Sequence, residues 1–221
     1  MLQAVLFDLD GTLADTAMDL GGALTRLLAK KGLPVMPMSA MRPIASHGAN
    51  GLIKLGAGID LDHPDHARWR REYLAEYEQV FCCDTVLFAD INDLIDGLHR
   101  QGLTWGIITN KPHTFTQRLV PTLGFCVPPA VVVSGDTCAA PKPSMLPMQY
   151  ACAQIGIAPE HCLYVGDAER DMQAGKQAGM QTVLVNWGYI ADSDPVADWP
   201  ADYRVDSPQE LLALAISLRD L

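Results

Sequence analysis

Two aspartates, Asp8 and Asp10, are separated by a single residue and directly follow a short apolar run, Ala4 to Phe7. In an extended chain, residues two apart point to the same side, so the two carboxylates are expected to share one small space. Such charges repel each other unless a cation lies between them, and Mg²⁺, which prefers oxygen ligands, suits this position. Gly11 allows a sharp turn whose amides can bind phosphate oxygens. A surface Asp-Gly turn is the alternative, and the buried strand leading into the turn argues against it.

A second acidic group follows another apolar run, Cys162 to Val165, in the sequence Gly-Asp-Ala-Glu-Arg-Asp. Its members Asp167 and Asp171 stand four apart and share a face if a helix begins here. Glu169 lies off that face and is expected to be solvated. Together with Asp8, the pair could complete an oxygen-rich metal site. Acids that stabilise a helix N-terminus are the alternative, which this segment alone would satisfy equally well.

Two further polar groups follow predicted strands. Thr109 and Asn110, with Lys111 behind them, end one apolar run, and Lys142 lies in the loop beyond another. A hydroxyl at the end of a strand can donate to a phosphate oxygen, and a lysine can neutralise the charge of a phosphoryl-transfer transition state. A lone threonine or lysine carries little information. The positions of these residues after strands make them candidates.

Apolar runs that alternate with helix-length segments would position all four groups. This alternation predicts an α/β fold, a doubly wound parallel sheet with a Rossmann-like topology and helices on both faces. Open sheets of this kind bind ligands at the carboxyl ends of their strands, where the polar groups fall. The strands are expected at 4–7, 103–108, 130–133, 162–165 and 182–185, with helices at 16–32 and 91–101 and a last helix capped by Ser207 and Glu210.

Residues 34–84 have a helical pattern with no apolar strand, and 67–81, rich in Arg, Glu and Tyr, predicts a solvated helix. This stretch separates the first acidic group from the rest of the alternating pattern. We therefore expect a catalytic α/β core formed by residues 1–14 and 85–221, with an inserted helical cap formed by residues 15–84.

The composition limits the partners. The chain has 221 residues and a formal charge of −10, from 26 acidic and 16 basic residues. Nucleic acid or an anionic membrane would require a basic face, so neither is expected as a partner. The sequence has no apolar stretch long enough to span a bilayer and no secretory signal, which predicts a cytoplasmic protein. An anionic substrate must be attracted by a metal ion or by local donors.

The order of acid pair, threonine, lysine and acid pair, each after a strand, closely resembles the haloacid dehalogenase-like phosphatase superfamily over essentially the whole chain. The resemblance implies that Asp8 is the nucleophile and a metal ligand, and that Asp10 is the acid and then the base, with its backbone carbonyl on Mg²⁺. It also implies that Asp167 and Asp171 hold the metal. The phosphate would be bound by Leu9, Gly11, Thr109, Asn110 and Lys142.

Within the superfamily, the chain is most similar to phosphoglycolate phosphatase-like enzymes. Ser46-His47-Gly48-Ala49 in the predicted cap resembles their cap motif, so His47 and Gly48 are candidate substrate contacts, although a turn role for His47 is equally compatible with the pattern. The tail 186–190 and 198–202 resembles the branch that includes N-acetylmuramic acid 6-phosphate phosphatases. Met145 stands where the family often has a second proline, which affects the shape of the loop more than its chemistry.

The expected function is therefore Mg²⁺-dependent hydrolysis of a small phosphorylated metabolite, 2-phosphoglycolate or a sugar phosphate such as N-acetylmuramic acid 6-phosphate, by a monomer or homodimer. A phosphoacceptor receiver domain is one alternative, and the chain length, the cap and the Asp-x-Asp spacing oppose it. A halide-removing enzyme would not need the proton of Asp10. A sugar phosphomutase of the same fold is the third alternative. The threonine at position 12, after the glycine, is more typical of the phosphatases of the family than of its mutases.

Overall fold

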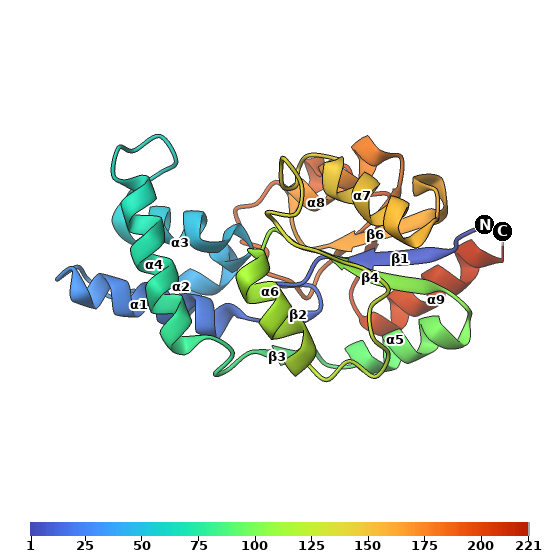
Figure 1. Cartoon of the computed structure of the whole chain (residues 1–221), viewed down its shortest axis with the longest axis horizontal. Coiled ribbons are helices and arrows are strands. Elements are labelled where there is room, and N and C mark those ends of the chain that lie inside the picture. Colours follow the sequence, from blue (N-terminus) through green and yellow to red (C-terminus); the bar gives the residue numbers. More distant parts are fainter. Residues whose placement is uncertain (221) are drawn as a thin grey trace.

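The computed structural model describes residues 1–220 (Figure 1). Within these residues, the larger sheet has six parallel strands in the order β5-β4-β1-β6-β7-β8. The chain builds outward from β1, first to β4 and β5 and then to β6, β7 and β8, which confirms the predicted doubly wound α/β fold. The strands are β1 (Ala4–Phe7), β4 (Thr104–Ile108), β5 (Val132–Val133), β6 (Cys162–Gly166), β7 (Gln181–Val185) and β8 (Tyr203–Val205).

Helices cover both faces of this sheet (Figure 1). Helices α5 and α9 pack together on one face, and α7 and α8 pack together on the other. Successive residues of β1 serve the two faces in turn: Val5 and Phe7 belong to the core beneath α5 and α9, and Ala4 and Leu6 belong to the core beneath α7 and α8. These core helices, with α6 after β4, are α5 (Ile91–Arg100), α6 (His113–Leu119), α7 (Leu146–Ile155), α8 (Glu169–Ala178) and α9 (Pro208–Arg219).

Three details of the core differ from the sequence-based predictions. The strand expected at 130–133 is only Val132–Val133, because it lies at the sheet edge and follows Pro128 and Pro129, which have no N–H to donate. β8 was not predicted. The last helix is capped by Ser207, whose Oγ accepts the Glu210 N–H at 3.2 Å, but the Glu210 carboxylate accepts the Asp206 N–H instead of closing the box on Ser207.

A separate group of helices follows β1 and contacts the carboxyl end of the sheet (Figure 1). The chain enters it through β2 (Ala14–Asp15) and leaves it through β3 (Val86–Leu87), and these two short strands pair antiparallel. Single turns between the main elements complete the fold. The helices of the group are α1 (Ala17–Lys30), α2 (Met38–Met41), the 3₁₀ helix η1 (Arg42–His47), α3 (Gly48–Ala57) and α4 (His66–Val80), and the other 3₁₀ turns are η2 (Val120–Thr122), η3 (Pro159–His161) and η4 (Val196–Asp198).

These helices have their own apolar core. It is formed mainly by α1, α3 and α4, with Leu24, Leu28 and Leu52 fully buried. The prediction that α4 is solvated is wrong for one of its faces, because Tyr73 and Tyr77 are buried there. Their separation by four residues places both side chains on one side of the helix, and the intervening charges had masked this apolar stripe.

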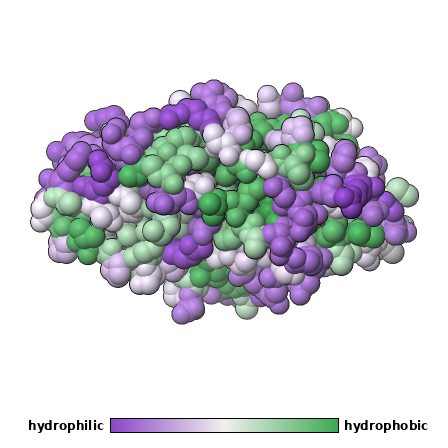
Figure 2. Space-filling view, turned by 90° about the horizontal axis from the view of Figure 1, so that it is seen from below, coloured by the Kyte–Doolittle hydropathy of each residue, from purple (hydrophilic) through white to green (hydrophobic). Residues whose placement is uncertain are grey.

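The surface view in Figure 2 shows hydrophilic side chains over much of this face, with apolar side chains near its middle and in smaller groups at both ends. Among residues 1–220, no helix is long and apolar enough to cross a membrane.

The close packing of β4 leads to a stability prediction. A Cβ added at Gly106 would lie 2.9 Å from the Val131 carbonyl oxygen and 2.6 Å from Val131 Cγ1. Gly106→Ala should therefore lower the free energy of unfolding by about 1–3 kcal/mol, the usual effect of overpacking. The matched control is Gly22→Ala in α1, whose added methyl would meet only Val80 Cγ2 at 3.9 Å. It should raise the stability by about 0.5–1 kcal/mol. Urea unfolding measures both, and equal effects would contradict the packing argument.

Candidate active site

The carboxyl ends of three adjacent strands bring the first set of predicted residues together. Asp8 follows β1, Thr109 follows β4 and Asp167 follows the end of β6. β1 pairs with β4 on one side and with β6 on the other, with Phe7 in register with both Ile107 and Val165. All three polar residues are buried. These three residues are far apart in the sequence, and they lie close together because the strands that they follow are neighbours in the sheet.

Asp8, Asp167 and Asp171 form a cluster in which one carboxylate oxygen of each lies within 4.8 Å of the others. Burial raises the pKa of Asp8 above its ordinary value, and Asp171 contributes to the rise although Lys142 opposes it. Burial, with the charges of Asp8 and Asp171, raises the pKa of Asp167 to about 7. Three buried like charges at this separation need positive charge among them.

Lys142 supplies part of that charge. Its Nζ lies 2.9 Å from Asp8 Oδ1 and 2.8 Å from Asp171 Oδ1, and its side chain is fully buried. The ammonium also donates to the Ile108 carbonyl and to Tyr164 Oη, each at 2.8 Å. The lysine is therefore held in one position by four oxygens.

Asn110 fixes the backbone of the lysine loop. Its amide donates to the Lys142 carbonyl at 2.9 Å, and its carbonyl oxygen accepts the Lys142 N–H at 3.0 Å. Leu9 is buried in the core, and its N–H donates to Asp8 Oδ1 at 2.8 Å. Gly11 has a φ of +86° and lies against Asp167, where a Cβ would come within 2.1 Å of a carboxylate oxygen. The predicted phosphate contacts of Leu9, Gly11, Thr109, Asn110 and Lys142 stay predictions.

The carboxylate cluster fits a magnesium ion. Its donors are all oxygens, the type that this ion prefers. Asp171 Oδ1 is buried and, among the described residues, accepts no hydrogen bond of good geometry despite its closeness to Lys142. Asp171 Oδ2 accepts the Ala168 N–H at 3.1 Å, which orients the carboxylate at the start of α8. Asp8, Asp167 and Asp171 are therefore the side chains that would hold the metal.

The side chain of Asp10 lies apart from this cluster. Its Oδ1 accepts from Lys111 Nζ at 2.9 Å and from Thr16 Oγ1 at 2.7 Å. Asp8 and Asp10 line one cavity, as their spacing predicts, but their charges have separate partners, because each pairs with its own lysine. β1 ends at Phe7, so the alternation of an extended strand no longer governs the direction of Asp10. The predicted metal contact of Asp10, through its backbone carbonyl, stays a prediction.

Lys111 and Arg170 are site residues to which the sequence analysis gave no role. Burial disfavours a charged Lys111, but Asp10 and Tyr77 hold its pKa above the ordinary value. Arg170 Nη2 lies 3.8 Å from Asp8 Oδ2. Both adjoin predicted site residues in the sequence, and that proximity was the one signal that could have found them.

Tyr189 connects the cluster to the base of the helical group. Its N–H donates to Asp167 Oδ2 at 2.9 Å. Its hydroxyl accepts the N–H groups of Thr16 and Ala17 at 2.7 and 3.0 Å and donates to Asp15 Oδ1 at 2.8 Å. Asp15 also accepts from Arg42 at 2.8 and 3.2 Å. One side chain therefore ties β2, the start of α1 and the acidic cluster together.

A second contact joins the helical group to the same carboxylate. Ser46 Oγ, in η1, donates to Asp167 Oδ2 at 2.5 Å. Gly188 allows the loop of Tyr189 to come this close, because a Cβ there would lie 2.2 Å from Asp167 Cβ. The sequence motif around Tyr189 was visible, but its partners were not.

A cavity of about 890 Å³ lies between the sheet and the helical group. Asp8, Asp10, Thr109 and Arg170 line its floor, and helical residues line its opposite wall. His47 and Gly48, the predicted substrate contacts, both belong to that wall. Burial, and then the charge of Arg170, lowers the pKa of His47, which favours its neutral form at neutral pH. The arrangement sets a buried carboxylate, an acid–base candidate and several cations at the closed end of a cavity.

Known structures share this architecture. A predicted phosphoglycolate phosphatase from Haemophilus somnus superposes with a TM-score of 0.83 at 24% identity and covers 96% of this chain and 97% of its own. A haloacid dehalogenase-like hydrolase from Bacteroides fragilis gives a TM-score of 0.84 at 22% identity, with coverage of 96% and 100%. These neighbours show the fold, an α/β sheet that here has its polar site at the carboxyl ends of the strands.

The chain belongs to the haloacid dehalogenase-like hydrolase family, whose model matches residues 5–185. A phosphoglycolate phosphatase from Xanthomonas campestris is 39% identical over 210 residues, which are 95% of this chain and 94% of the relative. An N-acetylmuramic acid 6-phosphate phosphatase from Pseudomonas aeruginosa is 37% identical over 211 residues, with coverage of 96% and 93%. The predicted family is confirmed, and so is the predicted class of enzyme, a phosphatase.

The contacts of Tyr189 predict the effect of removing its hydroxyl. Tyr189→Phe leaves two N–H groups and the Asp15 carboxylate short of a partner, so the free energy of unfolding should fall by about 1–3 kcal/mol. The control is Tyr203→Phe, because the hydroxyl of Tyr203 has an exposed contact with Gln181 at 3.4 Å. That variant should change the stability by no more than about 0.5 kcal/mol. Chemical unfolding at equilibrium compares the two, and a similar loss in both would contradict the role given to Tyr189.

Proposed function

We propose that this chain is a Mg²⁺-dependent phosphatase that hydrolyses N-acetylmuramic acid 6-phosphate in preference to 2-phosphoglycolate. The observation that carries the preference is the cavity of about 890 Å³ above Asp8. Pockets of this size bury ligands much larger than the two-carbon acid glycolate, and a substituted amino sugar would fill more of the space. Relatives with either activity match nearly the whole chain at similar identity, so the comparisons do not distinguish between the two substrates.

In the proposed reaction, Asp8 attacks the phosphorus atom. A bond forms between an Asp8 carboxylate oxygen and phosphorus as the ester bond to the sugar oxygen breaks, which gives an aspartyl-phosphate. Asp10 donates a proton to the departing sugar oxygen and then takes a proton from the water that attacks phosphorus. The water's oxygen ends in inorganic phosphate, and Asp8 is restored as a carboxylate.

The surrounding cations balance the negative charge of this reaction. Lys142, 2.9 Å from Asp8 Oδ1, would stabilise the charge on the transferring phosphoryl group, and Thr109 would donate to one of its oxygens. Lys111 and Thr16 hold the Asp10 carboxylate in position. When bound by Asp8, Asp167 and Asp171, Mg²⁺ would supply charge stabilisation to the phosphoryl oxygens.

The helical group would act as a cap over this reaction, with residues 15–84 as the cap and 1–14 and 85–221 as the core. The pairing of β2 with β3, at the two points where the chain passes between the parts, supports these boundaries. The separate apolar core of the helices supports them too. A closed cap would exclude bulk water and strengthen the local charge interactions.

A comparison of two substrates tests the proposal. The unmodified enzyme should release phosphate from N-acetylmuramic acid 6-phosphate with a higher kcat/KM than from 2-phosphoglycolate. Asp8→Asn removes the nucleophile, so turnover should fall on the order of 10⁴-fold or more. The control is Asp96→Asn, at a half-buried residue of α5 that pairs with Arg100 at 2.6 Å, and it should keep full activity. A higher kcat/KM for 2-phosphoglycolate would overturn the preference, and substantial turnover by Asp8→Asn would overturn the mechanism.

Removal of the metal tests the second part of the proposal. A chelator should abolish phosphate release and Mg²⁺ should restore it, whereas Zn²⁺ should support it poorly at an all-oxygen site. Asp167→Asn should raise the Mg²⁺ concentration for half-maximal activity more than Asp171→Asn, since Lys142 at 2.8 Å already balances the charge of Asp171. Mg²⁺ titrations of both variants measure this. Full activity in excess chelator would refute the metal requirement.

A further inference from the structure

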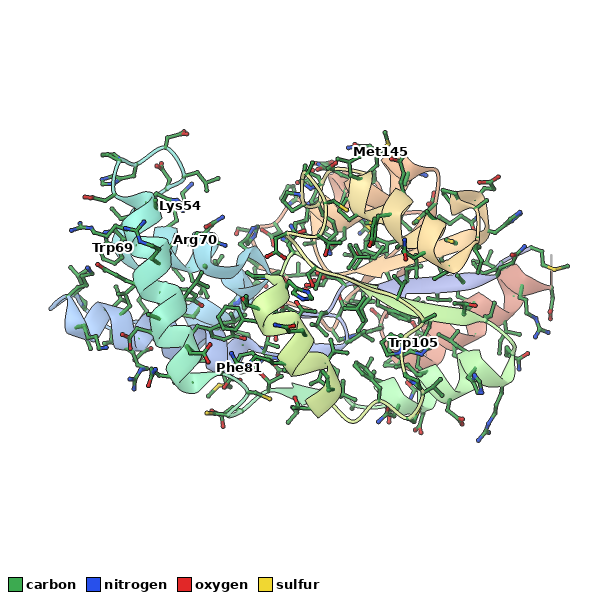
Figure 3. The ribbon with its side chains drawn as sticks, viewed as in Figure 1. Lys54, Trp69, Arg70, Phe81, Trp105 and Met145 are labelled. Atoms are coloured by element: carbon green, nitrogen blue, oxygen red, sulfur yellow. The ribbon has the colours of Figure 1, made fainter. Side chains whose placement is uncertain are left out.

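The cap wall of the cavity carries two cations that the proposed phosphoryl transfer does not use. Lys54 lies on α3 and Arg70 on α4, and both line the cavity that contains Asp8. Figure 3 shows the two side chains on the side of the cap that faces the core, whereas Trp69, the neighbour of Arg70, points away from it. The two helices pack against each other, so both cations belong to one wall.

These cap cations differ from the lysines of the catalytic site. Lys142 pairs with Asp8 at 2.9 Å and with Asp171 at 2.8 Å, and Lys111 pairs with Asp10 at 2.9 Å, so the charge of each lysine is balanced inside the protein. Over residues 1–220, neither Lys54 nor Arg70 has a carboxylate within 4.0 Å. Arg70 is half-buried and Lys54 is exposed. Their charges are therefore available to a ligand in the cavity.

We propose that Lys54 and Arg70 form a carboxylate-binding subsite that recognises an acid group carried by a sugar leaving group, as on a lactyl ether. This inference rests on the proposed function, in which the phosphate end of the substrate occupies the floor at Asp8. The leaving group then extends toward the cap, and a carboxylate on it would meet the two cations of the wall. An arginine binds a carboxylate through paired N–H groups, and a lysine adds a point charge.

The charge of the whole chain makes such a subsite useful. With a formal charge of −10, the protein repels a substrate that carries both a phosphate and a carboxylate. Asp60 and Asp62, in the loop between α3 and α4, also line the cavity and add to this repulsion. Asp60, Asp62 and Lys54 are all exposed and are screened alike by solvent and salt, whereas the half-buried Arg70 is screened less. Lys54 and Arg70 would offset the repulsion at the place where the second anion binds.

Two phosphorylated amino sugars isolate the contribution of the carboxylate. N-acetylmuramic acid 6-phosphate differs from N-acetylglucosamine 6-phosphate by one lactyl ether, which bears the carboxylate, and the phosphate ester is the same in both. The ratio of their kcat/KM values therefore reports recognition of the lactyl group and cancels changes in the chemical step. The unmodified enzyme should favour the muramic acid ester.

The variants are Lys54→Met and Arg70→Met, which keep much of the apolar stem and remove the charge. Each should lower the ratio of kcat/KM values about tenfold or more and leave kcat/KM for the glucosamine ester unchanged. Arg70→Lys keeps the charge and should recover part of the ratio. The matched control is Arg68→Met on the same helix, where the exposed guanidinium pairs with Asp65 at 3.2 Å, and its ratio should equal that of the unmodified enzyme.

Each outcome has a separate meaning. A normal ratio in both methionine variants of an enzyme that hydrolyses the muramic acid ester would overturn the subsite and leave the proposed function standing. Equal kcat/KM for the two esters in the unmodified enzyme would also overturn the subsite. No phosphate release from either ester, with release from 2-phosphoglycolate, would overturn the proposed substrate and the subsite with it. Equal losses on both esters would assign Lys54 and Arg70 to cap structure and refute the subsite.

Discussion

The ion pairs of Lys142 with Asp8 and Asp171 are the interaction on which the rest of the site depends. The three partners are buried, and an isolated charge in such a place would be strongly destabilising. Here the charges compensate each other, and the ammonium is further held by the Ile108 carbonyl and Tyr164. The loop of Lys142 must consequently keep one conformation, which Asn110 enforces through its two backbone hydrogen bonds.

This constraint explains why the sheet order matters for the chemistry. β1 is central, and β4 and β6 lie on either side of it, so the residues that follow these strands converge without long connecting loops. Lys142 and Arg170 bring two positive charges to the three carboxylates of the cluster, so one negative charge is left unbalanced. Burial, together with the excess of negative charge, raises the pKa of Asp167, and the same excess suits the cluster to a divalent cation.

The helical group contacts the same cluster through Asp167. Ser46 of η1 and the backbone of Tyr189 both donate to Asp167 Oδ2, and the hydroxyl of Tyr189 accepts from the start of α1. Any movement of the helices that breaks the Ser46 contact would thus change the environment of a candidate metal ligand. The helical group and the acidic cluster therefore share one carboxylate, Asp167.

The sequence by itself determined the fold class, the positions of the main strands along the chain and the residues of the acidic cluster. The reason is that these features have local signals: apolar runs of strand length, helix-length spacing and polar residues at strand ends. Ser207 and the end of α1 near Gly32 were predictable for the same reason, since a cap and a left-handed turn depend on single residue types.

Only the tertiary structure decided which charges pair. The Asp10–Lys111 pair, the contact of Arg170 with Asp8 and the bridge made by Tyr189 join residues that are separated in the chain or whose side-chain directions depend on a turn. The strands β2 and β3 have two residues each, too few to show an alternating pattern. The position of Lys54 and Arg70 in the cavity wall depends on how the cap helices pack over the sheet. No local pattern encodes that packing, because it is set by apolar contacts between distant segments.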